Sequence, residues 1–153
     1  MSDEPIRILI VEARFYDDLA DALLEGATQA LTAFGAEYDV VTVPGALEIP
    51  AAISFALVGG EEGGTAYDGF VALGCVIRGE TAHFDFVCGS ATDGLLRVQL
   101  DHGLPVGFGL VTCDTVAQAQ ARAELGADGH NVGADAARAA LEIAGLARSI
   151  RSS

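Results

Sequence analysis

Short apolar runs alternate along the chain with longer stretches in which apolar residues recur at helical spacing. The run I-R-I-L-I-V at residues 6–11 is mostly β-branched and suits a strand buried on both faces. After this run, Leu19, Leu23 and Leu31 fall on one face of a helix. Strands that alternate with helices in this way predict a parallel sheet with helices on both of its faces.

The same pattern recurs to the end of the chain. Strands are predicted at residues 6–11, 38–43, 67–77 and 105–112, and helices at residues 17–34, 50–58, 83–101, 114–125 and 134–147. Asp17 or Asp18 can cap the first helix, and Asp114 can cap the fourth. Gly35 and Gly103 suit helix ends. The predicted fold class is therefore α/β, a three-layer α/β/α sandwich around a four-stranded parallel sheet.

The chain shows no linker, internal repeat or break in composition. Its length suits one domain over residues 1–153, with residues 1–5 as a flexible or extended arm. The acidic start does not resemble a signal peptide, and no apolar run approaches the roughly 20 residues of a membrane span. Cys75, Cys88 and Cys113 are widely spaced and indicate neither a disulfide framework nor a zinc site. These features predict a cytoplasmic protein that does not bind membranes.

Acidic residues outnumber basic residues by 22 to 8, which gives a net charge of −14. A charge of this sign disfavours nonspecific binding to nucleic acid and docking on anionic lipid. All 8 basic residues are arginine, which excludes a Schiff-base lysine, a pyridoxal phosphate lysine and a complete Walker motif. The mean hydropathy of +0.40 fits either a large subunit interface or a core rich in Ala and Val.

Ligand sites in parallel α/β sheets lie at the carboxyl ends of the strands. The first strand is not followed by G-x-G-x-x-G, which disfavours a dinucleotide site. Residues 74–81 have the glycine spacing of a phosphate loop, with Glu80 in the place of its lysine. Their backbone N–H groups and the Thr81 hydroxyl can hold a phosphate, although a plain strand-to-helix turn has the same spacing.

Three histidines differ in their setting. His83 lies at the start of a predicted helix, where the cationic imidazole is disfavoured and a proton acceptor is favoured. A capping or surface histidine would show the same pattern. His102 lies at a helix end and is typical of a surface residue, and His130 in the Gly-rich loop is ambiguous.

Further candidates each have a functional and a structural interpretation. Phe15 can stack on a planar ligand or cover the edge of the core. Glu48 can accept hydrogen bonds from ligand hydroxyls or occupy the first turn of a helix. Arg122 can bind a phosphate group or form a salt bridge within the protein. Phe108 stands between two glycines that leave room beside its ring, although a core Phe would look similar.

Three longer motifs are more specific than any single residue: ARF at residues 13–15, VPGALEIP at 43–50 and ALGCVIRGETAHFDFV at 72–87. On these motifs the chain resembles the lumazine synthase family of riboflavin biosynthesis over residues 6–146. The resemblance implies a flavodoxin-like fold. It also implies condensation of 5-amino-6-(D-ribitylamino)uracil with 3,4-dihydroxy-2-butanone 4-phosphate to 6,7-dimethyl-8-ribityllumazine, with loss of phosphate and water. No metal or organic cofactor is implied, so catalysis would rest on positioning and proton transfer.

The resemblance also implies roles for individual residues. Phe15 would stack on the pyrimidine ring, Glu48 would accept hydrogen bonds from the ribityl chain, and His83 would shuttle protons. The residues implied at the phosphate are Glu80, Thr81 and, from a neighbouring subunit, Arg122. The remaining residues implied in the pyrimidine and ribityl pocket are Ala46, Leu47, Cys75, Val76, Ile77 and, from the neighbouring subunit, Phe108.

An active site between subunits requires a homo-oligomer. The chain departs from the family pattern where Val132 stands in the place of a lysine and the preceding loop is longer. His130 is a candidate to replace part of the missing charge, and Tyr16 stands where asparagine is common. Because this turn lies near contacts between pentamers in the family, the longer loop favours a pentamer over a decamer or a sixty-subunit shell.

Other functions stay open at this point. A non-catalytic flavin- or lumazine-binding paralogue would bind riboflavin without turnover; the missing lysine favours it, whereas His83, Thr81 and Arg122 oppose it. A structural shell protein, whose function is its assembly, would form an oligomer without catalysing a reaction. An unrelated phosphate-binding protein with a flavodoxin-like fold would not explain the long motifs.

Overall fold

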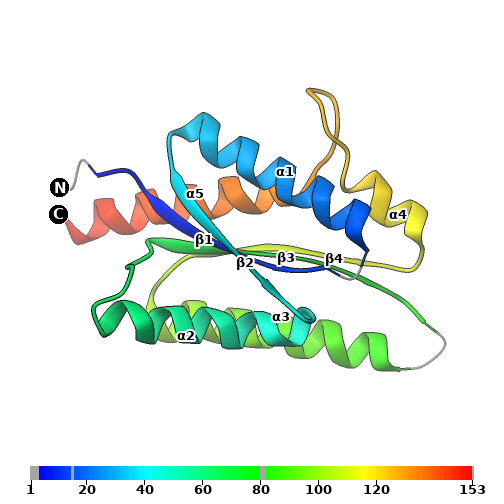
Figure 1. The fold of residues 1–153 in the computed structure, drawn as a ribbon, viewed down its shortest axis with the longest axis horizontal. Helices are drawn as coiled ribbons and strands as arrows, with labels where there is room; N and C mark the ends of the chain where they lie inside the picture. The colour runs from blue at the N-terminus through cyan, green and yellow to red at the C-terminus, as the bar shows by residue number, and fades with distance from the viewer. Residues whose placement is uncertain (1–3, 15, 80–81, 153) are drawn as a thin grey trace.

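The computed structural model describes residues 4–14, 16–79 and 82–152 and confirms the three-layer α/β/α prediction. Its sheet has four parallel strands in the order β2-β1-β3-β4 (Figure 1). The strands are β1 (Arg7–Ala13), β2 (Glu37–Val43), β3 (Gly69–Ile77) and β4 (Val106–Cys113). This strand order is that of a flavodoxin-like sheet, which places ligand sites at the carboxyl edge.

Helices cover both faces of the sheet (Figure 1). One layer contains α1 (Asp17–Phe34), the short α4 (Val116–Ala121) and α5 (Val132–Arg151). The other layer contains the 3₁₀ helix η1 (Ala46–Glu48), α2 (Ile49–Glu61) and α3 (His83–His102). None of the helices that the structure describes is both long and apolar enough to span a membrane.

The apolar runs form strands because both faces of the central strands are covered. Ile8 and Ile10 are fully buried on the α1 and α5 face, and Leu9 and Val11 are buried on the α2 and α3 face. Each such side chain contributes about 1.5–3 kcal/mol of transfer free energy. β2 is different because it is an edge strand, and Val40 in it is 39% exposed.

The helix ends follow the predicted glycines, but the helix starts do not follow the predicted aspartates. Gly35 and Gly103 have φ angles of 89° and 64°, the left-handed conformation that glycine adopts without strain. Tyr16, not Asp17 or Asp18, is the N-cap residue of α1. The aspartates instead lie in the first turn, where the helix dipole favours negative charge.

The fourth predicted helix is shorter than the sequence pattern indicates. α4 is capped by Thr115, whose side chain accepts a hydrogen bond from Gln118 N, and not by Asp114. The helix ends at Ala121, short of the predicted residue 125, because the chain turns back into an antiparallel bridge between Ala123 and Asn131.

α5 begins two residues before its predicted start because Asn131 caps it. The Asn131 side chain accepts a hydrogen bond from Ala134 N and donates one to Ala22 O of α1, each at 3.0 Å. Gly133 lies against the backbone of Leu23, where any side chain would overlap the Leu23 carbonyl. Asn131 and Gly133 therefore allow α1 and α5 to approach closely.

β1 extends to Ala13 and includes Glu12, which the sequence pattern placed in a loop. The Glu12 side chain is buried, yet it accepts hydrogen bonds from Thr42 Oγ1 at 2.8 Å and from Arg14 Nε at 3.3 Å. A buried carboxylate costs free energy unless it is paired, and these two partners satisfy that requirement. Glu12 can therefore continue the strand.

Candidate active site at the carboxyl edge of the sheet

An open cleft of about 190 Å³ lies at the carboxyl ends of β1 and β3. The loop after β2 and the first turns of α3 complete its walls. The candidate residues that line it are Ala46, Cys75, Val76, Ile77 and His83. Residues from two motifs that are far apart in the sequence thus meet at the edge where ligands bind in parallel α/β sheets.

The end of β3 borders the cleft with its backbone. β1 pairs with β3 only as far as Glu12 and Leu73, whereas β4 follows β3 to Ile77. In this register, the edge of β3 that faces away from β4 is left without a strand over its last residues. Backbone N–H and C=O groups on that edge can therefore hydrogen-bond a planar heterocycle.

Cys75 is a half-buried thiol in the cleft wall. Burial raises its pKa to about 11, and the neighbouring Cys113 thiol adds to the effect. The side chain is thus protonated at neutral pH and contributes a weakly polar surface, not a nucleophile.

His83 is the first residue of α3 and is exposed at the mouth of the cleft. The N-cap residue, Ala82, makes no side-chain cap. Because the imidazole lines the same cavity as the β3 edge, it lies within reach of a ligand bound there. This position suits a group that transfers protons to or from a substrate.

Leu47 and Glu48 lie beside the cleft and not in its wall. Both belong to η1 and are exposed, while Ala46 before them is buried. Glu48 is also the residue from which α2 begins, so its acidic side chain lies where a helix dipole favours it. The functional and structural interpretations of Glu48 are therefore compatible.

Phe108 and Arg122 do not line the cleft of their own chain. Phe108, on β4, is 36% exposed and is not a core residue. The neighbouring glycines do not make room for its ring. They make room for other parts of the fold, because a side chain at Gly107 would overlap the Ala136 carbonyl of α5, and one at Gly109 would overlap β3.

Arg122 follows α4 and is exposed. Its Nη1 donates a hydrogen bond to Gln118 O at 3.0 Å and lies 3.9 Å from Cys113 Sγ. Within the part of the chain that the structure describes, Arg122 forms no salt bridge. A guanidinium without a carboxylate partner can bind an anion.

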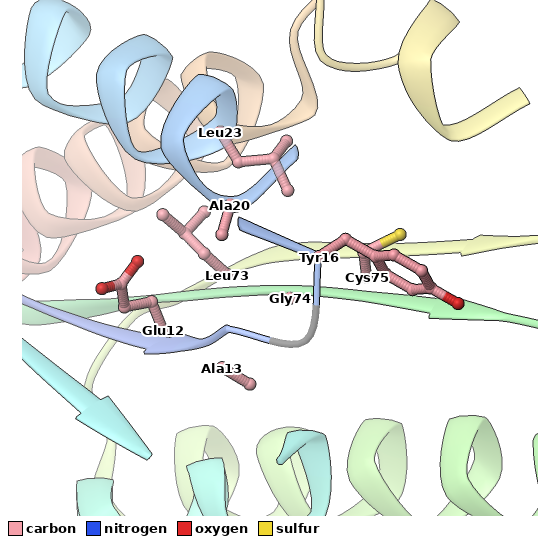
Figure 2. A pocket seen from close by; sticks show the side chains of 8 residues that line it. All are labelled: Glu12, Ala13, Tyr16, Ala20, Leu23, Leu73, Gly74 and Cys75. Carbon is pink, nitrogen blue, oxygen red and sulfur yellow. The ribbon is translucent and has the colours of Figure 1, made fainter. Parts of the chain in front are cut away.

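Three candidate residues, Phe15, Glu80 and Thr81, lie outside the described residues. Tyr16, which stands where asparagine is common in the family, does lie within the described residues. Figure 2 shows its ring beside Cys75, next to a small hollow that Glu12 and Leu23 also line. That hollow has no space for a water molecule, so it holds no ligand; the neighbouring cleft, which Tyr16 also lines, does have space.

The stretch around Val132 has a structural role that sequence reasoning missed. Val132 packs partly buried with Leu19 and Leu23, and Asn131 before it caps α5. His130 is exposed, with its Nε2 3.0 Å from Asp135 Oδ2, and it does not line the cleft of its own chain. An asparagine directly before a helical pattern was the signal for the cap.

His102 is exposed at the end of α3, beside a different hollow at the opposite edge of the sheet. Among residues 4–14, 16–79 and 82–152, no group of three His, Cys, Asp or Glu side chains is arranged to hold a metal ion.

Comparison with known proteins identifies close relatives of the chain. A model of the 6,7-dimethyl-8-ribityllumazine synthase family matches residues 5–148. The 6,7-dimethyl-8-ribityllumazine synthase 1 of Rhizobium meliloti is 58% identical over 138 residues, 90% of this chain and 89% of that protein. The 6,7-dimethyl-8-ribityllumazine synthase of Agrobacterium fabrum is 54% identical over 143 residues, 94% of this chain and 95% of that protein. The 6,7-dimethyl-8-ribityllumazine synthase of Nitrobacter hamburgensis is 55% identical over 142 residues, 93% of this chain and 86% of that protein.

Proposed function

The chain belongs to the 6,7-dimethyl-8-ribityllumazine synthase family, and from this premise we propose how its cleft carries out the reaction. The enzyme is a transferase of riboflavin biosynthesis. It condenses 5-amino-6-(D-ribitylamino)uracil with 3,4-dihydroxy-2-butanone 4-phosphate to 6,7-dimethyl-8-ribityllumazine, phosphate and water. The observation that carries the assignment is the meeting of His83 and the β3 edge in one cleft, within a chain that matches the family from residue 5 to residue 148.

The pyrimidine lies against the end of β3, where its polar edge bonds the backbone of Cys75, Val76 and Ile77. Support comes from the register, which leaves this edge of β3 without a strand partner. Phe15 stacks on the ring, and Ala46, Leu47 and Glu48 hold the ribityl chain, with the Glu48 carboxylate as acceptor. The exposed positions of Leu47 and Glu48 beside the cleft agree with this placement.

His83 moves protons during the condensation. The substrate amine attacks the ketone carbon, and water leaves as the imine forms. Phosphate is then eliminated, the ribityl-bearing nitrogen attacks the remaining carbonyl carbon, and a second water leaves as the ring closes. Proton transfer is needed at the amine and at the departing oxygen. The imidazole at the mouth of the cleft can supply it, while the site holds both substrates in contact.

The phosphate is bound by Glu80 and Thr81 of one subunit and by Arg122 of the next. The Arg122 guanidinium, which no carboxylate of the described chain neutralises, supports this role. The cleft of about 190 Å³ is open to solvent, and in this proposal a neighbouring subunit closes it. Phe108 of that subunit supplies the opposite wall.

The enzyme forms a homo-oligomer, and we favour a pentamer over a decamer or a sixty-subunit shell. Exposed apolar side chains on α2 and α3 supply surface for subunit contacts. They include Phe55, Phe86, Leu96 and Leu100. The connection between α4 and α5 projects from the body of the chain (Figure 1) and would stand between pentamers. Free thiols at Cys75, Cys88 and Cys113 suit the reducing cytoplasm.

A direct assay tests this proposal. Purified protein is mixed with both substrates, and lumazine formation is followed by absorbance and fluorescence against the uncatalysed reaction. Catalysis above that background is the expected result and shows that Val132 is tolerated. Binding of riboflavin or product without turnover would overturn the proposal in favour of a non-catalytic paralogue. Sedimentation velocity of the same sample gives the subunit number.

A further inference from the structure

We propose that Arg78 is a positioning residue for His83, and that its guanidinium fixes the start of α3 relative to the end of β4. This inference rests on the proposed proton-transfer role of His83. Arg78 itself does not line the cleft. It acts through contacts with Phe84 and Asp85, the two residues that follow His83 in the chain.

The first set of contacts joins Arg78 to the first turn of α3. The guanidinium carbon lies 4.5 Å from the centroid of the Phe84 ring, a distance at which a cation is attracted to an aromatic face. Nη2 lies 3.6 Å from Asp85 Oδ1. Phe84 is buried, so the ring is a fixed platform. The guanidinium thus adds a second attachment, beside the burial of Phe84, for the helix turn that begins at His83.

The second set of contacts joins Arg78 to the connection after β4. Its Nε donates to Asp114 Oδ1 at 2.7 Å, and its backbone N donates to Cys113 O at 2.8 Å. Asp114 is fixed in turn, because its own N donates to Gln118 Oε1 of α4 at 2.8 Å. One planar group thus links β3, α3 and the start of α4.

The charges around Arg78 argue against a role for it in binding phosphate. Asp85 and Asp114 face it with two negative charges, which leave no net positive charge for a substrate anion. Arg122 differs, since its Nη1 donates to a neutral backbone carbonyl. Arg78 and Arg122 therefore have different tasks: Arg78 holds the protein and Arg122 holds the phosphate.

The geometry of the group matters as well as its charge. Exposed ion pairs are individually weak, and the Arg78 side chain is 47% exposed. A planar guanidinium can stack on Phe84 while its N–H groups reach carboxylates on two sides. Lysine keeps the positive charge, but its ammonium group is not planar and lacks the forked N–H groups of a guanidinium. The variant Arg78→Lys therefore separates positioning from charge.

A double-mutant cycle tests the inference in the intact enzyme. In the wild-type background, we expect Arg78→Lys to lower kcat about tenfold and to leave the KM for the pyrimidine within about twofold. In a His83→Ala background, the same change should lower kcat by less than about twofold, because the group it positions is gone. The variant Asp114→Asn, at an exposed position, should reproduce the loss more weakly.

The control is Arg138→Gln on α5, which breaks an exposed Arg–Asp ion pair that does not line the cleft, and its kcat should equal that of the wild type. Equal losses from Arg78→Lys with and without the His83 imidazole would overturn the inference, as would a loss confined to KM. Failure of the proposed function shows differently, because the wild-type enzyme itself would then form no lumazine above background.

Discussion

The carboxamide of Asn131 lies directly over Gly26 of α1, so close that any side chain at Gly26 would overlap it. The carboxamide cannot move aside easily, because it caps Ala134 N and donates to Ala22 O at the same time. The missing Cβ of Gly26 is therefore part of the contact between α1 and α5. Gly26 has no other evident reason to stand in the middle of a helix, where glycine is destabilising.

The variant Gly26→Ala should lower the free energy of unfolding by about 1–3 kcal/mol, as expected for an overpacked site. Helix propensity alone would predict a gain of about 1 kcal/mol for this change. Gly145→Ala is the matched control, because no atom lies within 4 Å of the added Cβ on α5. Urea midpoints at equal protein concentration should move in opposite directions; a stabilised Gly26→Ala would refute the contact.

His83→Ala should lower kcat by about 10²-fold, the lower part of the range for general acid–base groups. Affinity for the pyrimidine should stay within about twofold, because in the proposed site the β3 edge, and not the imidazole, holds the ring. Steady-state kinetics and a fluorescence titration with the product measure the two quantities. An unchanged kcat would remove His83 from the mechanism.

Arg122→Ala should raise the KM for the butanone phosphate at least about tenfold and leave the KM for the pyrimidine unchanged. Because Arg122 and His83 of one site are proposed to come from different subunits, the two variants should complement each other when they are assayed with butanone phosphate well below its KM. Mixed oligomers of Arg122→Ala and His83→Ala subunits should regain about a quarter of wild-type activity at random mixing. No recovery would place both residues in a site within one chain.

Tyr67 should be the source of a late step in the alkaline titration. Burial, together with the hydrogen bond to Asp39 Oδ2 at 2.7 Å, raises the pKa of Tyr67 to about 12. The folded state thus holds this proton more tightly than the unfolded state. Its contribution to stability is complete below about pH 10 and is lost between about pH 10 and 12.

Tyrosinate absorbance can follow that step directly. Tyr67→Phe should remove the step near pH 12 and flatten the loss of thermal stability over the same range. Tyr38→Phe is the control, on the exposed edge strand β2. Persistence of the late step in Tyr67→Phe would contradict the assignment.

Cys75 should react slowly with iodoacetamide even though it borders an open cleft. With a pKa of about 11, its thiolate fraction at pH 8 is about 10²-fold below that of a free thiol. Mass spectrometry of the Cys75 peptide, in native and in urea-unfolded protein, measures the ratio of rates. A native rate equal to the unfolded rate would show that burial does not protonate the thiol.

The fold could be read from the sequence because its signals are local. The apolar runs that become β1 and β3 are buried on both faces, and Gly35 and Gly103 end their helices as expected. Cys75 and His83 could be assigned to one cleft because the carboxyl ends of parallel strands share an edge. Caps were less certain, since Asp114 and Thr115 are adjacent and both suit an N-cap.

Contacts between distant segments could not be predicted from the pattern. Arg78 and Asp114 are 36 residues apart, and no periodicity connects them. Asn131 stands in a Gly-rich stretch that is typical of a loop, yet its side chain bonds α1, 109 residues earlier in the chain. Glu12 interrupted an apolar run, and only its pairing with Thr42 on β2 explains why the strand continues.

The projecting connection between α4 and α5 is closed at its base. Ala123 pairs with Asn131, Glu124 N donates to His130 O at 3.0 Å, and Val132 N donates to Arg122 O at 2.8 Å. Residues can therefore be gained or lost at the tip while Arg122 and the start of α5 stay in place. In the proposed assembly, where this tip stands between pentamers, a lineage can therefore change the number of subunits through the length of the tip while the residues of the active site stay the same.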